Sequence, residues 1–184
     1  MAYGYETIRM KRAIIVLLSM YCCISCDVVQ QDKDRVKKEV HTLLVNWHQA
    51  ATDANFENYF GAMDSLSVFI GTAAEEVWTK AQFQVFSKPY FDKGKAWSFH
   101  ALDRNIYVND TGNFVWFDEL LDTWMGTCRG SGVLEKTGDV WKIKQYVLSV
   151  PIPNEDIQAV IAIKNKKDAL FLEKYQQSFF KVRK

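Results

Sequence analysis

The sequence predicts an α+β domain in which N-terminal helices pack on one face of a curved antiparallel sheet. Three observations support this class. Apolar residues recur at helical spacing between residues 35 and 91, strand-like segments joined by turns occupy residues 97–149, and Pro151 and Pro153 end the sheet before a final helix. The 184 residues, 48% of them hydrophobic, suit one globular domain with a sizeable core.

The N-terminal elements are amphipathic helices and a short strand. Residues 35–51 predict a helix with one buried stripe, formed by Val36, Val40, Leu43, Leu44 and Trp47. Asp53 to Asn55 cap a second short helix over residues 56–63. Residues 65–72 alternate in polarity and end near a glycine, which predicts a short strand.

A third helix and a run of strands come next. Thr79 is the expected N-cap of a helix that reaches Phe91, with Pro89 disturbing its last turn. Residues 97–149 alternate between strand-like segments and turns, which predicts an antiparallel meander. Asn154 then caps a final helix whose first turn is acidic.

The N-terminus has the layout of an export leader. A start at Met10 would place Lys11 and Arg12 directly before an apolar run over residues 13–24. That run is shorter than the roughly 20 residues that a membrane-spanning helix needs. We therefore expect a leader that is removed, with Met10 as the true start.

The cysteines refine this expectation. Ser25 is the small residue that a lipoprotein signal peptidase site requires, so residues 1–26 resemble a bacterial lipoprotein signal with Cys26 as the lipidated first mature residue. Residues 27–34 would form a polar tether. We expect an exported protein anchored by lipid in the bacterial cell envelope, periplasmic or surface-facing. An ordinary signal peptide with incidental cysteines is the alternative. With Cys26 acylated, Cys128 would be the remaining thiol, so no mature disulfide is expected.

Composition and motifs exclude several classes of function. A formal net charge of +1 gives no global attraction to nucleic acid. The mature chain has no HxH, HExxH or CxxC spacing, so no metal site is expected, and we predict no cofactor. The GSG of residues 130–132 lies within a strand rather than before a helix, so it is not a nucleotide loop.

Five segments in the correct order resemble the SnoaL-like branch of the nuclear transport factor 2-like superfamily. They are Trp47 in the first helix, NFENYFGAMDSLSVFIGT, EEVWTKAQFQVFSKPYF, VWFDELLD and RGSGVLEKTGDVWKIKQYVLS. The resemblance implies a cone-shaped domain over residues 35–153, with a pocket between the concave sheet face and the helices, and a helical extension over residues 154–184. Members of the superfamily include isomerases, cyclases, dehydratases and plain binding modules, so the fold does not name a reaction.

The expected turn at Thr137-Gly138-Asp139 decides which side chains face this pocket. A three-residue connection with Gly138 in the left-handed region would pair Val133 with Ile143 and Ser131 with Gln145. The inner face would then carry Arg129, Ser131, Val133, Trp141, Ile143, Gln145 and Val147.

The same register places Glu119 opposite Arg129, with Val115 and Phe117 on the same side. One interpretation is a buried ion pair with a structural role. The other is catalytic, with Arg129 orienting an anionic or carbonyl oxygen while Glu119 acts as a base.

Asp64 is a further candidate base, because the resemblance places an acidic residue near the mouth of the cone at this position. Apolar neighbours would have to raise its pKa, whereas a simple capping role is the alternative. Many SnoaL-like relatives carry a polar residue, often histidine, where this chain has Val147, which removes a natural proton shuttle. His41 and His48 are expected on the solvated flank of the first helix, while His100 could face either way.

Three functions remain open. The leading one is binding of a small hydrophobic or amphipathic molecule, with pocket walls and polar contacts supplied by Trp47, Tyr59, Phe69, Phe117, Trp141, Ser131, Gln145, Arg129, Glu119 and Asp64. The second is a cofactor-independent isomerase, dehydratase or hydrolase that uses a pocket carboxylate. The third is a structural or interaction module, in which Phe114 and Trp116 on the convex sheet face form a homodimer.

Overall fold

The computed structural model describes residues 32–182 and the side chains of residues 32–176. The predicted leader and most of the predicted tether therefore lie outside the described residues. Contacts divide the chain into two compact units, which meet between Val150 and Pro151. The first unit holds the helices and the sheet that the sequence predicts, and the second holds the C-terminal helix.

The helices of the first unit form where the apolar stripes predict them. The described part of the N-terminal helix spans residues 32–52, and Val40 and Leu44 on its stripe are completely buried. Helix α2 (Phe56–Gly61) begins after Asn55, whose side chain accepts a hydrogen bond from the Asn58 amide. Helix α3 (Lys80–Asp92) begins with a capping box between Thr79 and Gln82 and contains Pro89.

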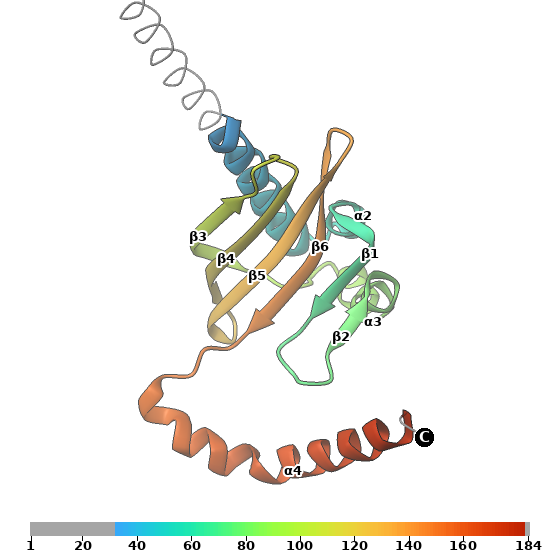
Figure 1. The fold of residues 1–184 in the computed structure, drawn as a ribbon, viewed down its shortest axis with the longest axis vertical. Helices are drawn as coiled ribbons and strands as arrows, with labels where there is room; N and C mark the ends of the chain where they lie inside the picture. The colour runs from blue at the N-terminus through green and yellow to red at the C-terminus, as the bar shows by residue number, and fades with distance from the viewer. Residues whose placement is uncertain (1–31, 183–184) are drawn as a thin grey trace, which may run out of the picture. The chain divides into compact units, whose positions relative to one another are not determined.

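The described strands form one sheet in the order β2-β1-β6-β5-β4-β3 (Figure 1). Their bounds are β1 Met63–Ile70, β2 Val77–Thr79, β3 His100–Val108, β4 Phe114–Thr123, β5 Gly126–Thr137 and β6 Val140–Ser149. Strands β3 to β6 form the predicted antiparallel meander. Strand β1 instead pairs parallel with β6, so the sheet is mixed rather than purely antiparallel. The short β2, which the sequence analysis missed, pairs antiparallel with β1.

The hairpin between β5 and β6 corrects the predicted register. Thr137 pairs with Val140, so the turn has two residues, Gly138 and Asp139, and Gly138 has the expected positive φ of 60°. An irregularity between Val133 and Leu134 then shifts the register further. The predicted pairings were wrong: Leu134 pairs with Ile143, Val133 with Gln145, and Ser131 with Val147.

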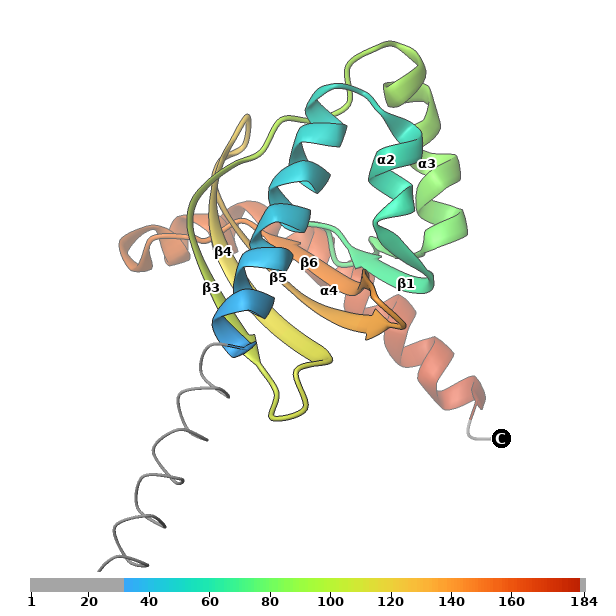
Figure 2. The same ribbon diagram turned by 90° about the horizontal axis from the view of Figure 1, so that it is seen from above.

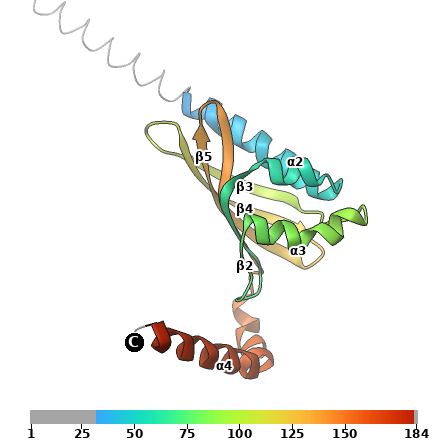
Figure 3. The ribbon, with the colours of Figure 1, turned by 90° about the vertical axis from the view of Figure 1, so that its right-hand side faces the viewer.

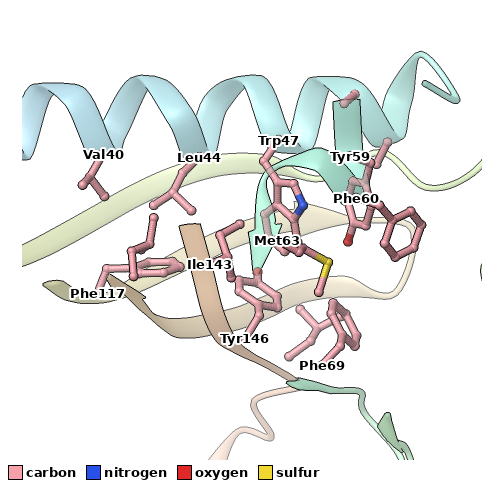
Figure 4. Packing of buried hydrophobic residues seen from close by; sticks show 14 of the residues in the cluster. Val40, Leu44, Trp47, Tyr59, Phe60, Met63, Phe69, Phe117, Ile143 and Tyr146 are labelled. Carbon is pink, nitrogen blue, oxygen red and sulfur yellow. The ribbon is translucent and has the colours of Figure 1, made fainter. Parts of the chain in front are cut away.

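The N-terminal helix, α2 and α3 all lie on one face of the sheet, as Figure 3 shows from the side. Viewed from above, β3 to β5 curve around the N-terminal helix (Figure 2). The main hydrophobic core fills the space between these helices and the sheet. Its centre contains Leu44 and Trp47 from the helix, Tyr59 from α2, and Phe117 and Tyr146 from the sheet (Figure 4). The predicted α+β architecture is confirmed.

The second unit consists of the short 3-10 helix Asn154–Asp156 and helix α4 (Ile157–Val182). The predicted C-terminal helix is therefore present. Phe171 and Tyr175, one turn apart on α4, contact each other with ring centroids 4.8 Å apart. Within the described part of the chain, no helix combines the length and the apolar character needed to cross a membrane.

Candidate functional site

Glu119 lies at the centre of the first unit, with its side chain completely buried. Strand β4 alternates, so that Val115, Phe117, Glu119 and Leu121 all point into the core. This inward orientation was predicted from the sequence. A buried carboxylate is costly unless it is paired and hydrogen-bonded, so its partners define the chemistry of the interior.

Three side chains from three different elements hold the Glu119 carboxylate. His48 Nε2 lies 2.8 Å from Oε1, and Tyr146 donates its hydroxyl to the same oxygen at 2.8 Å. Arg104 donates from Nε to Oε2 at 2.8 Å, and its Nη2 lies 2.7 Å from that oxygen. We call Glu119, His48, Tyr146 and Arg104 the buried polar cluster.

Local sequence explains how the buried polar cluster fits. Arg104 is the register partner of Glu119 on β3, whereas Gly130 is its partner on β5. A Cβ atom at Gly130 would collide with the Tyr146 hydroxyl and would lie 2.9 Å from Glu119 Oε1. The first glycine of the GSG segment therefore leaves room for the contact between Tyr146 and Glu119.

Electrostatics fix the protonation states of two groups in the cluster. Burial alone would raise the pKa of Glu119, but the hydrogen bond and charge of His48, the charge of Arg104 and the hydrogen bond from Tyr146 together lower that pKa below its ordinary value. Burial and the nearby Glu119 charge raise the pKa of Tyr146 well above its ordinary value. At neutral pH the cluster therefore contains a carboxylate anion that accepts from a protonated tyrosine.

Arg129 is not the partner of Glu119, so that prediction was wrong. It pairs with Leu120 on β4, and its side chain is 56% exposed and lies 3.9 Å from Asp118. Glu119 pairs with Gly130 across β4 and β5, one position from the predicted partner, and this reverses the face that each residue of β5 occupies. His48 was also misplaced by sequence reasoning: it is 5% exposed and belongs to the cluster rather than to the solvated helix flank.

Asp64 lies on β1, next to the inward-facing Met63, and its side chain is 18% exposed. Its Oδ1 accepts from the Leu66 amide at 2.9 Å and lies 3.2 Å from Lys144 Nζ. The Leu66 hydrogen bond, followed by the hydrogen bond and charge of Lys144, lowers the pKa of Asp64 despite partial burial. The raised pKa that a catalytic role required is therefore contradicted.

The predicted pocket walls are part of the solid core. Trp47, Tyr59, Phe117 and Trp141 are each at most 6% exposed, and Trp47 stacks on Tyr59 with centroids 4.9 Å apart. Figure 4 shows several of these rings packed together between the helix and the sheet. The other two predicted contacts do not face the interior: Gln145 is exposed, and Ser131 is half-buried on the face opposite Gly130 and Gly132. Trp47, Tyr59, Phe117 and Trp141 therefore pack as core side chains in this structure.

A cavity of about 150 Å³ opens where β1, β2 and α3 meet the β4–β5 turn. We call it the mouth cavity. Its lining is mostly aromatic: Phe69, Gly71, Thr72, Glu76, Trp78, Phe83, Phe86, Trp97, Phe99, Trp124, Met125 and Leu148. Of the predicted ligand contacts, only Phe69 belongs to this lining. For the other lining residues, the helical spacing of Phe83 and Phe86 was the pattern in the sequence that could have indicated them. Spacing alone, however, does not distinguish the wall of a cavity from a packed core.

Rings connect the mouth cavity to the buried polar cluster. Phe99 lies between them, with its ring centroid 6.1 Å from that of His48, and Phe69 lies 5.6 Å from Tyr146 by the same measure. The carboxylate of Glu119 is thus separated from the cavity by a layer of aromatic side chains. Among the residues that the structure describes, no group of His, Cys, Asp and Glu side chains is arranged to hold a metal ion.

Comparisons with known proteins agree with this architecture. The model of the SnoaL-like domain family matches residues 40–153. A nuclear transport factor 2-like protein of unknown function from Pseudomonas putida is similar in structure, with a TM-score of 0.54, 14% identity, and coverage of 64% of this chain and 88% of that one. No curated protein matches the chain.

A second solved structure, a nuclear transport factor 2-like protein from Cytophaga hutchinsonii, has a TM-score of 0.53 and 14% identity, covering 62% of this chain and 98% of that one. At such identities the structural likeness establishes the fold alone. The family match spans more than half of the sequence, from within the N-terminal helix to just beyond the end of the sheet. The chain therefore belongs to the SnoaL-like domain family and has the nuclear transport factor 2-like fold.

Proposed function

We propose that this domain binds a small apolar molecule in the mouth cavity. The observation that carries the proposal is the lining itself, in which aromatic side chains from α3, β1, β2 and the β4–β5 turn surround a space of about 150 Å³. Concave, mostly apolar cavities with few polar groups are the usual form of small-molecule sites.

The size and chemistry of the cavity limit the ligand. An apolar cavity of about 150 Å³ is large enough for a molecule of the size of benzene. Glu76 is the ionisable group of the lining, and its Oε2 accepts from the Ala73 amide at 3.0 Å, which ties it to its own loop. We therefore expect a single ring or short branched chain, with any polar end directed outward past the exposed Trp124.

The alternative of an enzyme that uses a pocket carboxylate has weaker support. Glu119 has a lowered pKa and is already engaged by His48, Tyr146 and Arg104, so it is poorly suited to take a proton from a substrate. Asp64 also has a lowered pKa and lies outside the mouth cavity. The geometry thus supports binding better than turnover.

Binding can be tested by recording amide chemical shifts of the protein during titration with toluene. We expect saturable shifts at the mouth cavity and an affinity that falls about tenfold in Phe86→Ala, because a buried ring contact is worth about 1 kcal/mol or more. Tyr90→Ala is the matched control, since Tyr90 lies one turn further along α3, is similarly exposed and does not line the cavity. Equal losses in both variants, or no binding by the wild type, would contradict the proposal.

We further propose that the protein is exported and held to a membrane through lipid on Cys26. The support is the leader sequence over residues 10–26. Metabolic labelling of bacteria with an alkyne fatty acid should tag the full-length protein but not Cys26→Ala. Cys22→Ala should be labelled like the wild type, and unlabelled wild type would leave the ordinary signal peptide as the better interpretation.

A homodimer through the sheet is a third proposal. Trp116 and Phe114 do face outward from β4, as predicted, with 46% and 38% exposure, and Tyr107 stacks on Trp116 with centroids 5.8 Å apart. Sedimentation should show a dimer that Trp116→Lys dissociates. Val85→Lys, which also introduces a lysine at an exposed apolar position but on α3, should leave the dimer intact. A wild type that sediments as a monomer would refute this.

A further inference from the structure

A second hollow lies at the β3 edge of the sheet and has a different chemistry. It has a volume of about 700 Å³ and is formed by the N-terminal helix on one side and by β3 on the other. We call it the edge groove, and its lining is Lys37, Lys38, His41, Thr42, Arg104, Asn105, Ile106 and Tyr107. The edge groove and the mouth cavity share no lining residue.

The charged side chains that line the edge groove all have the same sign. Lys37, Lys38 and Arg104 supply positive charge, and none of the described lining residues is a carboxylate. Lys37 and Lys38 are exposed, and within the described part of the chain neither ammonium group has a salt-bridge partner. Four of the other eight described lysines on this unit, Lys33, Lys88, Lys136 and Lys144, are by contrast paired with carboxylates. The groove therefore holds the unpaired positive charges of Lys37 and Lys38 beside Arg104, whose own charge is balanced by Glu119.

Arg104 is fixed in the floor of the edge groove by the buried polar cluster. Its side chain is 3% exposed, and Nε and Nη2 both contact Glu119 Oε2. The third nitrogen, Nη1, points to the His41 side of the groove, where its contacts are long: 3.3 Å to His41 Nδ1 and 3.5 Å to the His41 carbonyl oxygen. A guanidinium held in this way loses little side-chain entropy on binding, and Nη1 keeps the capacity for a stronger acceptor.

The remaining lining supplies an apolar surface beside this charge. Ile106 is half-buried and lies on the same side of β3 as Arg104, whereas the ring of Tyr107 stacks on Trp116 on the outward face. A volume of about 700 Å³ exceeds what a lone inorganic ion fills and lies in the range of sites for small organic molecules.

From this combination we infer that the edge groove binds a small organic anion, in which a carboxylate or phosphate meets Lys37, Lys38 and Arg104 Nη1 while an apolar body contacts Ile106. Such a ligand would replace the long contacts of Nη1 with charge-assisted hydrogen bonds. The inference is independent of the mouth cavity, because an uncharged molecule suffices there.

Benzoate and phenyl phosphate are suitable probes, with benzamide as the uncharged analogue and inorganic phosphate as the anion without an apolar body. Binding to the wild-type protein is followed by titration calorimetry and by amide shifts. We expect at least one organic anion to bind, with shifts in residues 37–42 and 104–107 rather than in α3. Benzamide and inorganic phosphate should bind at least tenfold more weakly.

The decisive variant is Lys37→Gln/Lys38→Gln, which changes exposed residues and leaves the buried polar cluster intact. The affinity for the organic anion should fall about tenfold, the effect of losing two partly exposed ionic contacts. Lys93→Gln/Lys95→Gln is the matched control, since it removes the same charge from two exposed lysines after α3. The control should bind like the wild type.

Several results would overturn the inference. If the wild-type protein binds neither benzoate nor phenyl phosphate, the inferred site for organic anions is refuted. Equal losses in both double variants would indicate a response to net charge, and benzamide binding as tightly as benzoate would place the probe in an apolar site. Inorganic phosphate binding as tightly as phenyl phosphate would contradict the contribution of Ile106.

Discussion

Replacing Glu119 with glutamine tests how the buried polar cluster contributes to stability. The change keeps the shape of the side chain but removes a negative charge that contacts Arg104 at 2.7 Å and His48 at 2.8 Å with no solvent exposure. Removing one partner of a buried ion pair typically costs about 3–5 kcal/mol, because the remaining charge is buried without compensation. We therefore expect Glu119→Gln to lower the free energy of unfolding by about that amount.

Urea unfolding followed by tryptophan fluorescence measures the effect, with the midpoint and the slope fitted separately. Asp118→Asn is the matched control: it is the preceding residue on β4, its side chain is 35% exposed, and it lies 3.9 Å from Arg129. A change at this surface pair should stay within about 1 kcal/mol. Replacing both charges, as Glu119→Leu/Arg104→Met, should cost less than the sum of the single changes, because neither charge is then left alone.

The pH dependence of stability provides a second readout for the same residue. Because the pKa of Glu119 is lower in the folded protein than in the unfolded chain, its contribution is present above the unfolded value of about 4.3 and is lost as the pH falls through the folded value. Glu119→Gln should remove this acid-dependent part of the stability curve. If the variant unfolds within about 1 kcal/mol of the wild type and keeps the same acid profile, the assignment of the cluster as a stabilising ion pair is refuted.

The same packing predicts the outcome of other substitutions, all measured by urea unfolding. Gly130→Ala should destabilise by about 2–4 kcal/mol, because its Cβ would collide with Tyr146 and crowd Glu119, whereas Gly61→Ala, with no atom within 4 Å of the added Cβ, should be nearly neutral. Tyr146→Phe should cost about 1.5–3 kcal/mol, the worth of a buried hydrogen bond to a charged acceptor; a neutral result would show that Glu119 finds another donor. Thr79→Ala should cost about 1 kcal/mol by removing the cap of α3, and an unchanged midpoint would show that the capping box is dispensable.

Part of the candidate site could be predicted from the sequence. The inward orientation of Glu119 followed from the alternation of β4, which depends only on strand geometry. The identity of its cationic partner did not follow, because it required the register between β4 and β5, in which Glu119 pairs with Gly130 rather than with Arg129. A shift of one position moved Arg129 outward, and it left Arg104 of β3 as the partner.

His48 illustrates a second limit. Its position next to Trp47 placed it close to the edge of the apolar stripe, where the sequence cannot distinguish a solvated side chain from a buried one. Only the curvature of the sheet around the N-terminal helix brings His48 within 2.8 Å of Glu119. The mouth cavity and the edge groove were missed for the same reason, since their walls come from segments that are far apart along the chain.

The sequence by itself determined the α+β class, the family, and the caps at Asn55 and Thr79, because these depend on local spacing and on short motifs. Its hairpin turn also required the left-handed conformation that Gly138 adopts. The tertiary structure alone decided which charges meet and where open space remains. Aromatic side chains at helical or strand spacing can fill a core or surround a cavity, and only the packing of the helices against the curved sheet separates Trp47, which is buried, from Phe86, which lines an opening.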